Sequence, residues 1–391
     1  MANFIFENGT RLYFGKGMEK EVGRLCRQYT KTDTVMTVSY ADGPLRPLVE
    51  KVKNCLEAED LNVVEYNDVV PNPLLDKTRE AIQTARENNI GMVLGIGGGS
   101  CIDVAKAIAL GTGLHTDIWN VYIGEAEPEE VLPVGAIMTL AGTGSETSPF
   151  AVLTNTETVS KIGYGCTGMR PRFAILNPEL TYGVPAYQTM CGACDMFAHI
   201  CDAYLGRVED MKLVNRISES VMKTVIEYLP IVLKQPDNYE GRGQLMLAGT
   251  LAMGKFASMG LHTNLGLHTI AEDLGAVYNV THGAALAVIL PAWMTYLKKQ
   301  KFNLLLRYAR EVWNLDIDVD DPGKTVDAAI QKTKEFFAGV GLPVTLGELG
   351  IDFEKDGKML SERIDCAEDY DDAYIELTSA DVYEIYRLAS E

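Results

Sequence analysis

One carboxylate and three imidazoles in the second half of the chain have the types and spacing of a metal site. Asp195 and His199 lie four residues apart in AYQTMCGACDMFAHICDAYLG, a segment with helical character, and His268 and His282 follow on two further segments. Residues at i and i+4 share one face of a helix, so Asp195 and His199 can converge on one ion. Such a set suits Fe²⁺ or Zn²⁺ and suits Mg²⁺ or Ca²⁺ poorly.

Spacing alone leaves a second interpretation open. Four of the five histidines fall between residues 199 and 282, and an Asp-x3-His pair is a common accident. The eight cysteines indicate no structural zinc site, because the one Cys-x-x-Cys pair, Cys191 and Cys194, has no second pair to complete it. In a chain of this length without a signal pattern we expect reduced thiols, with a redox role for that pair as an alternative.

A glycine-rich turn is the second chemical signal. LGIGGGSCIDVAKAI places Gly97, Gly98 and Gly99 between a predicted strand and a predicted helix. Glycines let the backbone approach a pyrophosphate, and the helix N-terminus offers free N–H groups. The turn lacks the G-x-G-x-x-G pattern, so tight packing alone is an alternative. The segment TLAGTGSETS (139–148) offers further hydroxyls, and its alternative is an ordinary loop that caps a helix.

The elements that must position these residues suggest two domains in the 391-residue chain. Predicted strands at 32–40, 61–69 and 90–100 alternate with predicted helices at 45–60, 76–89 and 102–111, which is typical of a parallel α/β sheet. After Pro185 the pattern is helical, with apolar spacing of three and four residues at 208–233 and 324–341. We therefore expect an α/β N-terminal domain, 1–185, and an all-helical C-terminal domain, 186–391.

Composition narrows the class of protein. The formal net charge of −19, with no run rich in Lys or Arg, argues against nucleic acid as a partner. No apolar run approaches the roughly 18 residues of a membrane span, and the first residues lack a basic-then-apolar signal pattern. We expect a soluble, cytoplasmic protein that does not bind membranes.

Taken together, these segments resemble the iron-containing (group III) alcohol dehydrogenases, near the butanol dehydrogenase and aldehyde reductase branch. The resemblance spans nearly the whole chain: TRLYFGKG (10–17), VPNP (70–73), GIGGGSCIDVAKAIA (95–109), TLAGTGSETS (139–148), AILNPELTYGVP (174–185), the helix of Asp195 and His199, and the segment from His268 to HGAALAVILPAW. It implies a dehydroquinate synthase-like fold, with a dinucleotide-binding α/β domain and a helical metal-binding domain. It also implies hydride transfer between a nicotinamide and a small primary alcohol or aldehyde, and a homodimer formed through N-terminal segments.

The resemblance also assigns roles to individual residues. The Fe²⁺ or Zn²⁺ ligands are Asp195, His199, His268 and His282, and the pyrophosphate is assigned to Gly97, Gly98, Gly99 and Ser100. The residues matched to the remainder of the cofactor are Asn72, Asp103, Thr139, Thr143, Ser148, Lys161 and Leu180.

Two positions depart from the family pattern. Many NADP-using relatives have Tyr-Gly-Gly-Gly-Ser after the second strand, whereas this chain has Ser39-Tyr40-Ala41-Asp42-Gly43-Pro44. A carboxylate at Asp42 can bind ribose hydroxyls and repels a 2′-phosphate, which predicts NAD(H) over NADP(H). The second departure is Glu272, four residues after His268, where relatives usually carry a histidine discussed as a proton relay. Either Glu272 replaces that relay or protons travel through water and cofactor hydroxyls.

Alternatives to the dehydrogenase interpretation remain at this point. A glycerol-type polyol dehydrogenase shares the scaffold with a different, usually zinc, metal set, and the dehydroquinate synthase branch needs further basic residues. Neither fits TLAGTGSETS and NPELTYGVP as well. A catalytically weak protein that binds metal and nucleotide is the third alternative, and Glu272 lends it some weight.

Overall fold

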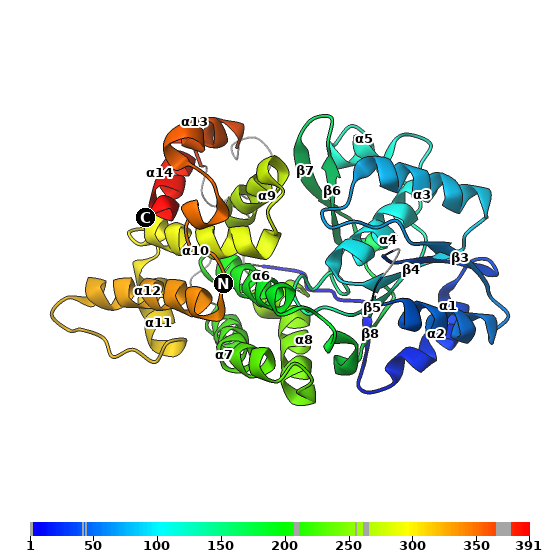
Figure 1. Cartoon of the computed structure of the whole chain (residues 1–391), viewed down its shortest axis with the longest axis horizontal. Coiled ribbons are helices and arrows are strands. Elements are labelled where there is room, and N and C mark those ends of the chain that lie inside the picture. Colours follow the sequence, from blue (N-terminus) through cyan, green and yellow to red (C-terminus); the bar gives the residue numbers. More distant parts are fainter. Residues whose placement is uncertain are drawn as a thin grey trace. The chain divides into compact units, whose positions relative to one another are not determined.

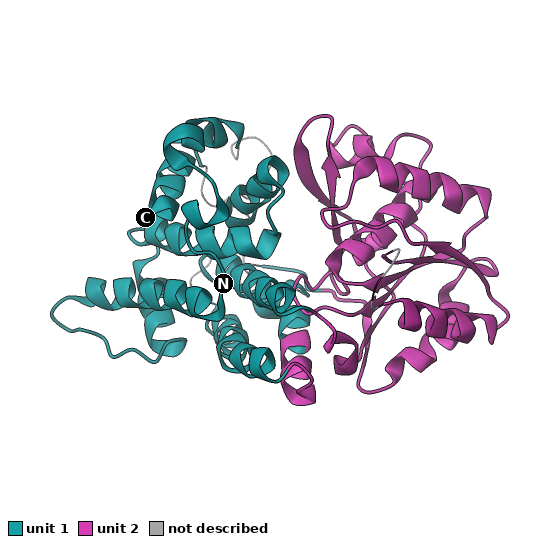
Figure 2. Ribbon diagram, in the orientation of Figure 1, with its two compact units in different colours: residues 1–6, 185–235, 247–391 teal, residues 7–184, 236–246 magenta. Residues whose placement is uncertain are grey.

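The chain divides into a sheet unit and a helical unit, each of which is described by itself (Figure 2). The computed structural model describes residues 3–40, 43, 45–206, 211–254, 256–260, 266–364 and 377–391. The sheet unit comprises Glu7–Val184 and Pro236–Met246, and the helical unit comprises Met1–Phe6, Pro185–Gln235 and Leu247–Glu391. The first six residues thus belong to the helical unit although the sheet unit follows them in sequence. Residues 236–246 belong to the sheet unit although helical-unit residues lie on both sides of them.

A six-stranded parallel sheet forms the centre of the first unit (Figure 1). Its order is β1-β8-β5-β4-β2-β3, and every neighbouring pair is parallel. The three strands predicted from sequence are β2, β3 and β4, and the pattern gave no signal for the others. The strands are β1 (Arg11–Phe14), β2 (Thr34–Val38), β3 (Asn62–Tyr66), β4 (Met92–Gly97), β5 (Val134–Met138) and β8 (Phe173–Leu176).

Helices cover both faces of this sheet, because successive residues of its strands point to opposite sides. On β2, Met36 and Val38 pack into one apolar core while Val35 packs into another. The first core also holds α3 (Leu75–Glu87), α4 (Gly99–Thr112) and α5 (Ile118–Tyr122). The second holds α1 (Val22–Tyr29) and α2 (Arg46–Glu57), with the 3-10 helix η1 (Met18–Glu21) beside them. This doubly covered parallel sheet confirms the predicted α/β class.

The glycine turn lies where the chain order of the strands reverses. From β2 the chain continues outward to β3, and from β4 it continues to β5 on the opposite side. In open α/β sheets, ligands bind outside the carboxyl ends of the strands at such a switch point. Gly97 is the last residue of β4, and α4 begins at Gly99, so the turn occupies that position.

A two-stranded hairpin, β6 (Phe150–Asn155) and β7 (Ser160–Gly165), follows the hydroxyl-rich loop. The sequence suggested a helix after this loop as the simpler interpretation, and that expectation is wrong. Two 3-10 helices, η2 (Thr167–Met169) and η3 (Pro178–Thr181), flank β8.

The helical unit confirms the second expected class and is arranged around α10 (His282–Leu297). Most α10 residues are buried, and a helix that is apolar all round belongs in a core. It contacts α6 (Ala186–Tyr204), α9 (Gly266–Tyr278), α12 (Pro322–Val340) and α14 (Ser379–Ser390). The remaining helices are α7 (Lys212–Lys234), α11 (Phe302–Glu311) and α13 (Phe353–Arg363), with the 3-10 helices η4 (Phe256–Ser258) and η5 (Gly347–Leu349). Helix α8 (Tyr239–Met253) belongs to the sheet unit as far as Met246 and to the helical unit from Leu247 onward. Among the described residues, no helix is both long enough and apolar enough to cross a membrane.

Candidate active site

Three helices of the second unit supply the four predicted metal ligands. Asp195 and His199 lie on α6, His268 lies on α9, and His282 is the first residue of α10. Helices α6 and α10 touch backbone to backbone, because a Cβ atom on Gly283 would lie 2.1 Å from the carbonyl oxygen of Cys191. Only glycine allows this approach, which brings His282 close to Asp195.

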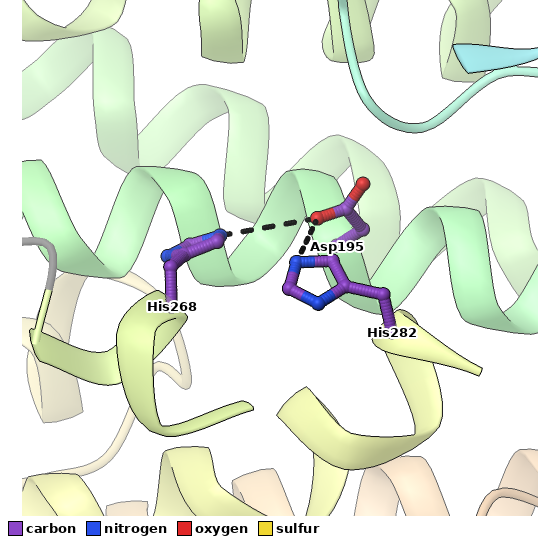
Figure 3. Close-up of side chains that lie close together, drawn as sticks. All are labelled: Asp195, His268 and His282. Atoms are coloured by element: carbon purple, nitrogen blue, oxygen red, sulfur yellow. Dashed lines mark ion pairs between the residues drawn. The ribbon is translucent and has the colours of Figure 1, made fainter. Parts of the chain in front are cut away.

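The three imidazoles converge on one carboxylate oxygen of Asp195 (Figure 3 shows Asp195, His268 and His282). Asp195 Oδ1 lies 3.3 Å from His199 Nε2, 3.9 Å from His268 Nε2 and 3.7 Å from His282 Nε2. The ring of His199 stacks on that of His268 with centroids 4.0 Å apart. One ligand atom from each of Asp195, His268 and His282 lies within 4.8 Å of the others, a spacing that one ion can bridge.

Two buried polar atoms at this point of convergence fit the binding of a divalent cation. Asp195 and His268 are each about 4% exposed. Their Oδ1 and Nε2 atoms form no hydrogen bond with any residue that the structure describes. Buried polar atoms are nearly always satisfied, so orphaned atoms of this kind call for a partner. A divalent ion with nitrogen and oxygen ligands would satisfy both.

Asp202 is a candidate site residue that the sequence analysis missed. Its Oδ2 atom is hydrogen-bonded to His268 Nδ1, and its side chain is buried on α6. A ligating histidine commonly donates its second ring N–H to a carboxylate, which fixes the tautomer and the ring orientation. The available signal was helical spacing, because Asp202 follows Asp195 by seven residues and His199 by three, on the same face of α6.

Opposing effects set the protonation of this group. Burial disfavours charge on His268, but the carboxylates of Asp202 and Asp195 outweigh it and raise the pKa of His268 to about 10. Burial, assisted by the neighbouring His268, lowers the pKa of His199 to about 3. Burial alone would raise the pKa of Asp195, but the surrounding imidazoles lower it. Asp195 therefore keeps its negative charge among the three imidazoles.

Two glycines of the turn after β4, Gly97 and Gly99, lie where an added Cβ atom would collide with a neighbouring side chain. A Cβ atom on Gly97 would lie 2.5 Å from Cys101 Sγ, and one on Gly99 would lie 2.7 Å from Thr143 Oγ1. Gly98 is the N-cap of α4 and Ser100 lies in its first turn, so backbone N–H groups are free to face a ligand. This arrangement has the form of an anion site at a helix N-terminus.

The hydroxyl-rich loop packs onto this turn. The N–H of Thr139 donates to Gly97 O at 2.9 Å, and Thr143 lies against Gly99. Ser148 accepts a hydrogen bond from the N–H of Phe150, at the start of β6. The structure thus brings Thr139 and Thr143 beside the glycines.

The other residues matched to the cofactor lie on neighbouring elements of the sheet unit. Lys161 on β7 donates to Asn72 Oδ1 at 3.2 Å, and Asn72 has a positive φ of 53°. Asp103 on α4 accepts hydrogen bonds from Ser145 Oγ and from the N–H of Val152. Leu180 lies in η3 and packs against the apolar core of α1 and α2.

Four residues singled out in the sequence need separate mention. Glu272 lies on α9, one helical turn after His268, and is half-buried. Asp42 lies outside the described residues. Cys191 and Cys194 are unpaired and buried on α6, and burial raises the pKa of the Cys191 thiol to about 11, which disfavours the redox alternative.

Family comparisons match both halves of the chain. Residues 9–178 match the family model described as iron-containing alcohol dehydrogenase. Residues 189–390 match the model of the C-terminal domain of the Fe-containing alcohol dehydrogenase family. The chain therefore belongs to the iron-containing alcohol dehydrogenase family.

Individual relatives cover most of the chain. It is 36% identical to a probable NADH-dependent butanol dehydrogenase of Bacillus subtilis, with 91% of each chain covered. It is 33% identical to NADH-dependent butanol dehydrogenase A of Clostridium acetobutylicum, again with 91% of each covered. Among solved structures, the NADH-dependent butanol dehydrogenase A of Thermotoga maritima has a TM-score of 0.93 at 29% identity and covers 100% of this chain and 99% of its own.

An aldehyde reductase is similar at nearly the same level. The chain is 32% identical to the NADPH-dependent aldehyde reductase YqhD of Escherichia coli, with 90% of each chain covered. A crystal structure of YqhD has a TM-score of 0.92 at 29% identity and covers 99% of this chain and 98% of its own. The relatives thus include both NADH- and NADPH-dependent proteins.

Proposed function

We propose that this protein is a metal-dependent, NAD(P)-linked alcohol dehydrogenase or aldehyde reductase, which transfers hydride between a nicotinamide and a small primary alcohol or aldehyde. The observation that carries the proposal is the convergence of His199, His268 and His282 on one buried oxygen of Asp195, in a chain of this family. Relatives described as butanol dehydrogenases and as an aldehyde reductase support the substrate class.

Asp195, His199, His268 and His282 would hold the ion, and the orphaned atoms of Asp195 and His268 fit it. When bound, Fe²⁺ or Zn²⁺ would polarise the oxygen of the alcohol or aldehyde as a Lewis acid. Asp202 would orient the ring of His268 so that Nε2 faces the ion, since Nδ1 is hydrogen-bonded to its carboxylate. We propose iron first, from the family description, with zinc as the alternative that the same ligands accept.

Gly97, Gly98, Gly99 and Ser100 would receive the pyrophosphate of the cofactor, since they lie at the N-terminus of α4, where backbone N–H groups can face an anion. The cofactor would supply or accept the hydride. We further assign its ribose and nicotinamide side to Asp103, Thr139, Thr143, Ser148, Lys161 and Leu180, and we place Asn72 near the cofactor. In the domain division that we propose, residues 1–185 bind the nucleotide and residues 186–391 bind the metal.

We propose NAD(H) as the preferred cofactor. The argument rests on Asp42, whose carboxylate would repel a 2′-phosphate, and is supported by the NADH-dependent relatives. The NADPH dependence of YqhD points the other way. The ratio of kcat/KM with NADH to that with NADPH tests this assignment, and a clear NADPH preference of the wild type would reject the role of Asp42.

Proton transfer is the step where this chain departs from its family. Glu272 projects from α9 one turn after His268, so we propose it as the group that takes over the proton relay. The alternative is a path through water and cofactor hydroxyls. Replacement by glutamine separates the two, because the relay requires an ionisable group and the water path does not.

We also propose a homodimer in the cytoplasm. Among the described strands, β1 pairs on one side alone, with β8, and its Leu12 and Phe14 are each about 40% exposed. An exposed apolar edge strand is a ready surface for pairing with a second chain. The mass in solution tests the dimer.

The decisive experiment combines metal analysis of anaerobically prepared protein with turnover assays. A panel of short alcohols and aldehydes, with glycerol included, is assayed with each cofactor separately. We expect about one divalent ion per chain and NADH-linked turnover of primary alcohols or aldehydes. Preference for glycerol would favour the polyol dehydrogenase alternative. Binding of cofactor and metal without turnover of any substrate would favour a binding protein and overturn the proposal.

A further inference from the structure

A fully buried lysine lies beneath the loop that covers the glycine turn. Lys106 on α4 has no exposed surface. Its ammonium donates to Ser145 Oγ at 2.6 Å and to the carbonyl oxygen of Phe150 at 2.7 Å. It also forms an ion pair with Asp103 Oδ1 at 3.9 Å. Lys106 therefore connects α4 to Ser145 in the loop and to Phe150 at the start of β6.

Ser145 extends this connection in two directions. Its hydroxyl accepts from Lys106 and donates to Asp103 Oδ1 at 2.6 Å. Its backbone N–H donates to Thr143 Oγ1 at 3.3 Å. That same oxygen of Thr143 would lie only 2.7 Å from a Cβ atom added to Gly99. A continuous chain of contacts thus runs from Lys106 through Ser145 and Thr143 to the glycine turn.

Asp103 completes the cluster. Its second oxygen, Oδ2, accepts from the N–H of Val152 at 3.2 Å, so its carboxylate fixes β6 as well as the loop. Burial raises the pKa of Asp103, whereas Lys106, Ser145, the Val152 N–H and Lys161 act in the opposite direction. Burial likewise lowers the pKa of Lys106 to about 8, and Asp103 opposes that shift. The negative charge of Asp103 and the positive charge of Lys106 therefore each favour the charged form of the other group.

Fold stability is a weak explanation for such a pair. Burying two charges costs desolvation energy that their attraction repays only with good geometry, and apolar replacements of similar volume are often no less stable. The hydrogen bonds of this cluster all end on the loop and the strand beside the glycine turn. The location of the cluster indicates that it positions this loop and strand.

We propose that Lys106 is a positioning residue of the dinucleotide site, which holds Asp103 and Ser145 in place and thereby fixes Thr143 over Gly99. The inference rests on the proposed function, because it assumes that the glycine turn binds a dinucleotide. Loss of the ammonium releases the loop from α4 and widens the range of positions that Thr143 adopts. The cost falls on cofactor binding.

The test compares two buried lysines. Lys106→Met removes the ammonium at similar volume, and Lys301→Met is the matched control, because Lys301 is also buried but donates to Gly206 O in the helical unit. NADH fluorescence titration gives the dissociation constant, and steady-state kinetics give KM for NADH and for the aldehyde. We expect Lys106→Met to weaken NADH binding about tenfold, with metal content and KM for the aldehyde unchanged. Lys301→Met should bind NADH as the wild type does.

A second variant covers the case in which Lys106→Met does not fold. Ser145→Ala removes one hydroxyl and keeps both charges, and we expect a smaller weakening in the same direction. Hydrogen exchange of residues 143–152 in the cofactor-free protein should accelerate in both variants and not in Lys301→Met.

The outcomes separate the two proposals. A wild type that binds neither NADH nor NADPH rejects the proposed function, whereas the exchange measurement still tests the link from Lys106 to the loop. A wild type that binds NADH, with variants that bind it equally well or show unchanged exchange, overturns the role of Lys106 alone.

Discussion

The metal group and the glycine turn are built in opposite ways. The metal group consists of side chains on α6, α9 and α10, spread from Asp195 to His282 in the sequence, and its function would depend on their charges and lone pairs. The glycine turn consists of backbone between Gly97 and Gly99, and its function would depend on the absence of side chains. The first is therefore broken by removing atoms and the second by adding them.

Removal of a metal ligand should have the largest effect. Asp195→Ala or His268→Ala deletes a ligand whose orphaned atom faces the proposed ion. We expect loss of bound metal and a fall in kcat/KM of at least about a thousandfold, since the ion supplies several kcal/mol of charge stabilisation. Circular dichroism should report an intact fold and NADH titration an unchanged affinity. Full turnover in a metal-free variant would remove the Lewis-acid role.

Asp202→Asn tests the carboxylate behind His268. The amide keeps the size of the side chain but removes its charge, so the ring of His268 loses its fixed tautomer. We expect metal affinity to fall about tenfold to a hundredfold, measured by competition with a chelator.

Glu219→Gln provides the control for this substitution. Glu219 is also a buried carboxylate of the helical unit, but it pairs with Arg307 and Tyr204. Its replacement should lower thermal stability and leave metal affinity unchanged. Equal metal affinities in the two variants would show that Asp202 is an ordinary buried acid.

Gly99→Ala adds one carbon atom to the turn and should have an intermediate effect. The new Cβ meets the side chain of Thr143 at 2.7 Å, so Thr143 or the turn must move. We expect NADH binding to weaken about tenfold while the metal content stays the same. Gly339→Ala on α12 is the control, because its Cβ meets nothing within 4 Å. Unchanged NADH affinity in Gly99→Ala would mean that the turn tolerates bulk and does not receive the pyrophosphate.

The smallest effect is expected for Glu65, a carboxylate that belongs neither to the metal group nor to the glycine turn. Burial disfavours the charge of Glu65 on β3, but Asn67, Arg46 and Lys53 outweigh it and lower its pKa from 4.5 to about 2. A carboxylate whose pKa is lowered by folding stabilises the fold at pH values above its ordinary pKa of 4.5. That stabilisation is lost as the pH falls from 4.5 toward 2.

The matching measurement is urea unfolding near neutral pH and near pH 3. After allowance for solvent screening, we expect Glu65→Gln to cost about 1 kcal/mol near neutral pH and less near pH 3. Glu57→Gln, on the exposed surface of α2, should cost less than Glu65→Gln at neutral pH. A cost of Glu65→Gln that does not depend on pH would contradict the assignment.

The sequence predicted what local spacing and family pattern encode. Helical spacing placed Asp195 and His199 on one face, and the segment after β4 showed its glycines directly. The role of Asp202 escaped prediction because it depends on His268, 66 residues away on another helix. Lys106 escaped for a similar reason, since a lysine in a helix ordinarily reaches solvent and its partner Ser145 lies 39 residues further on.

The missed strands have a different cause. The hairpin strand β7, SKIGYG, has two glycines and is half-buried along most of its length, so it lacks clear alternation. Strands β5 and β8 are only five and four residues long and wholly buried, and short apolar runs do not distinguish a strand from a helix.

The contact at Gly283 has a consequence for anyone who wishes to change the preferred ion. The main chains of α6 and α10 meet there so closely that even one added Cβ atom would collide with the carbonyl group of Cys191. The spacing of the two helices that carry Asp195 and His282 is therefore set by main-chain packing at this contact. A larger residue at position 283 would force α10 away from α6 and enlarge the opening for a cation, with all four ligands left in the sequence.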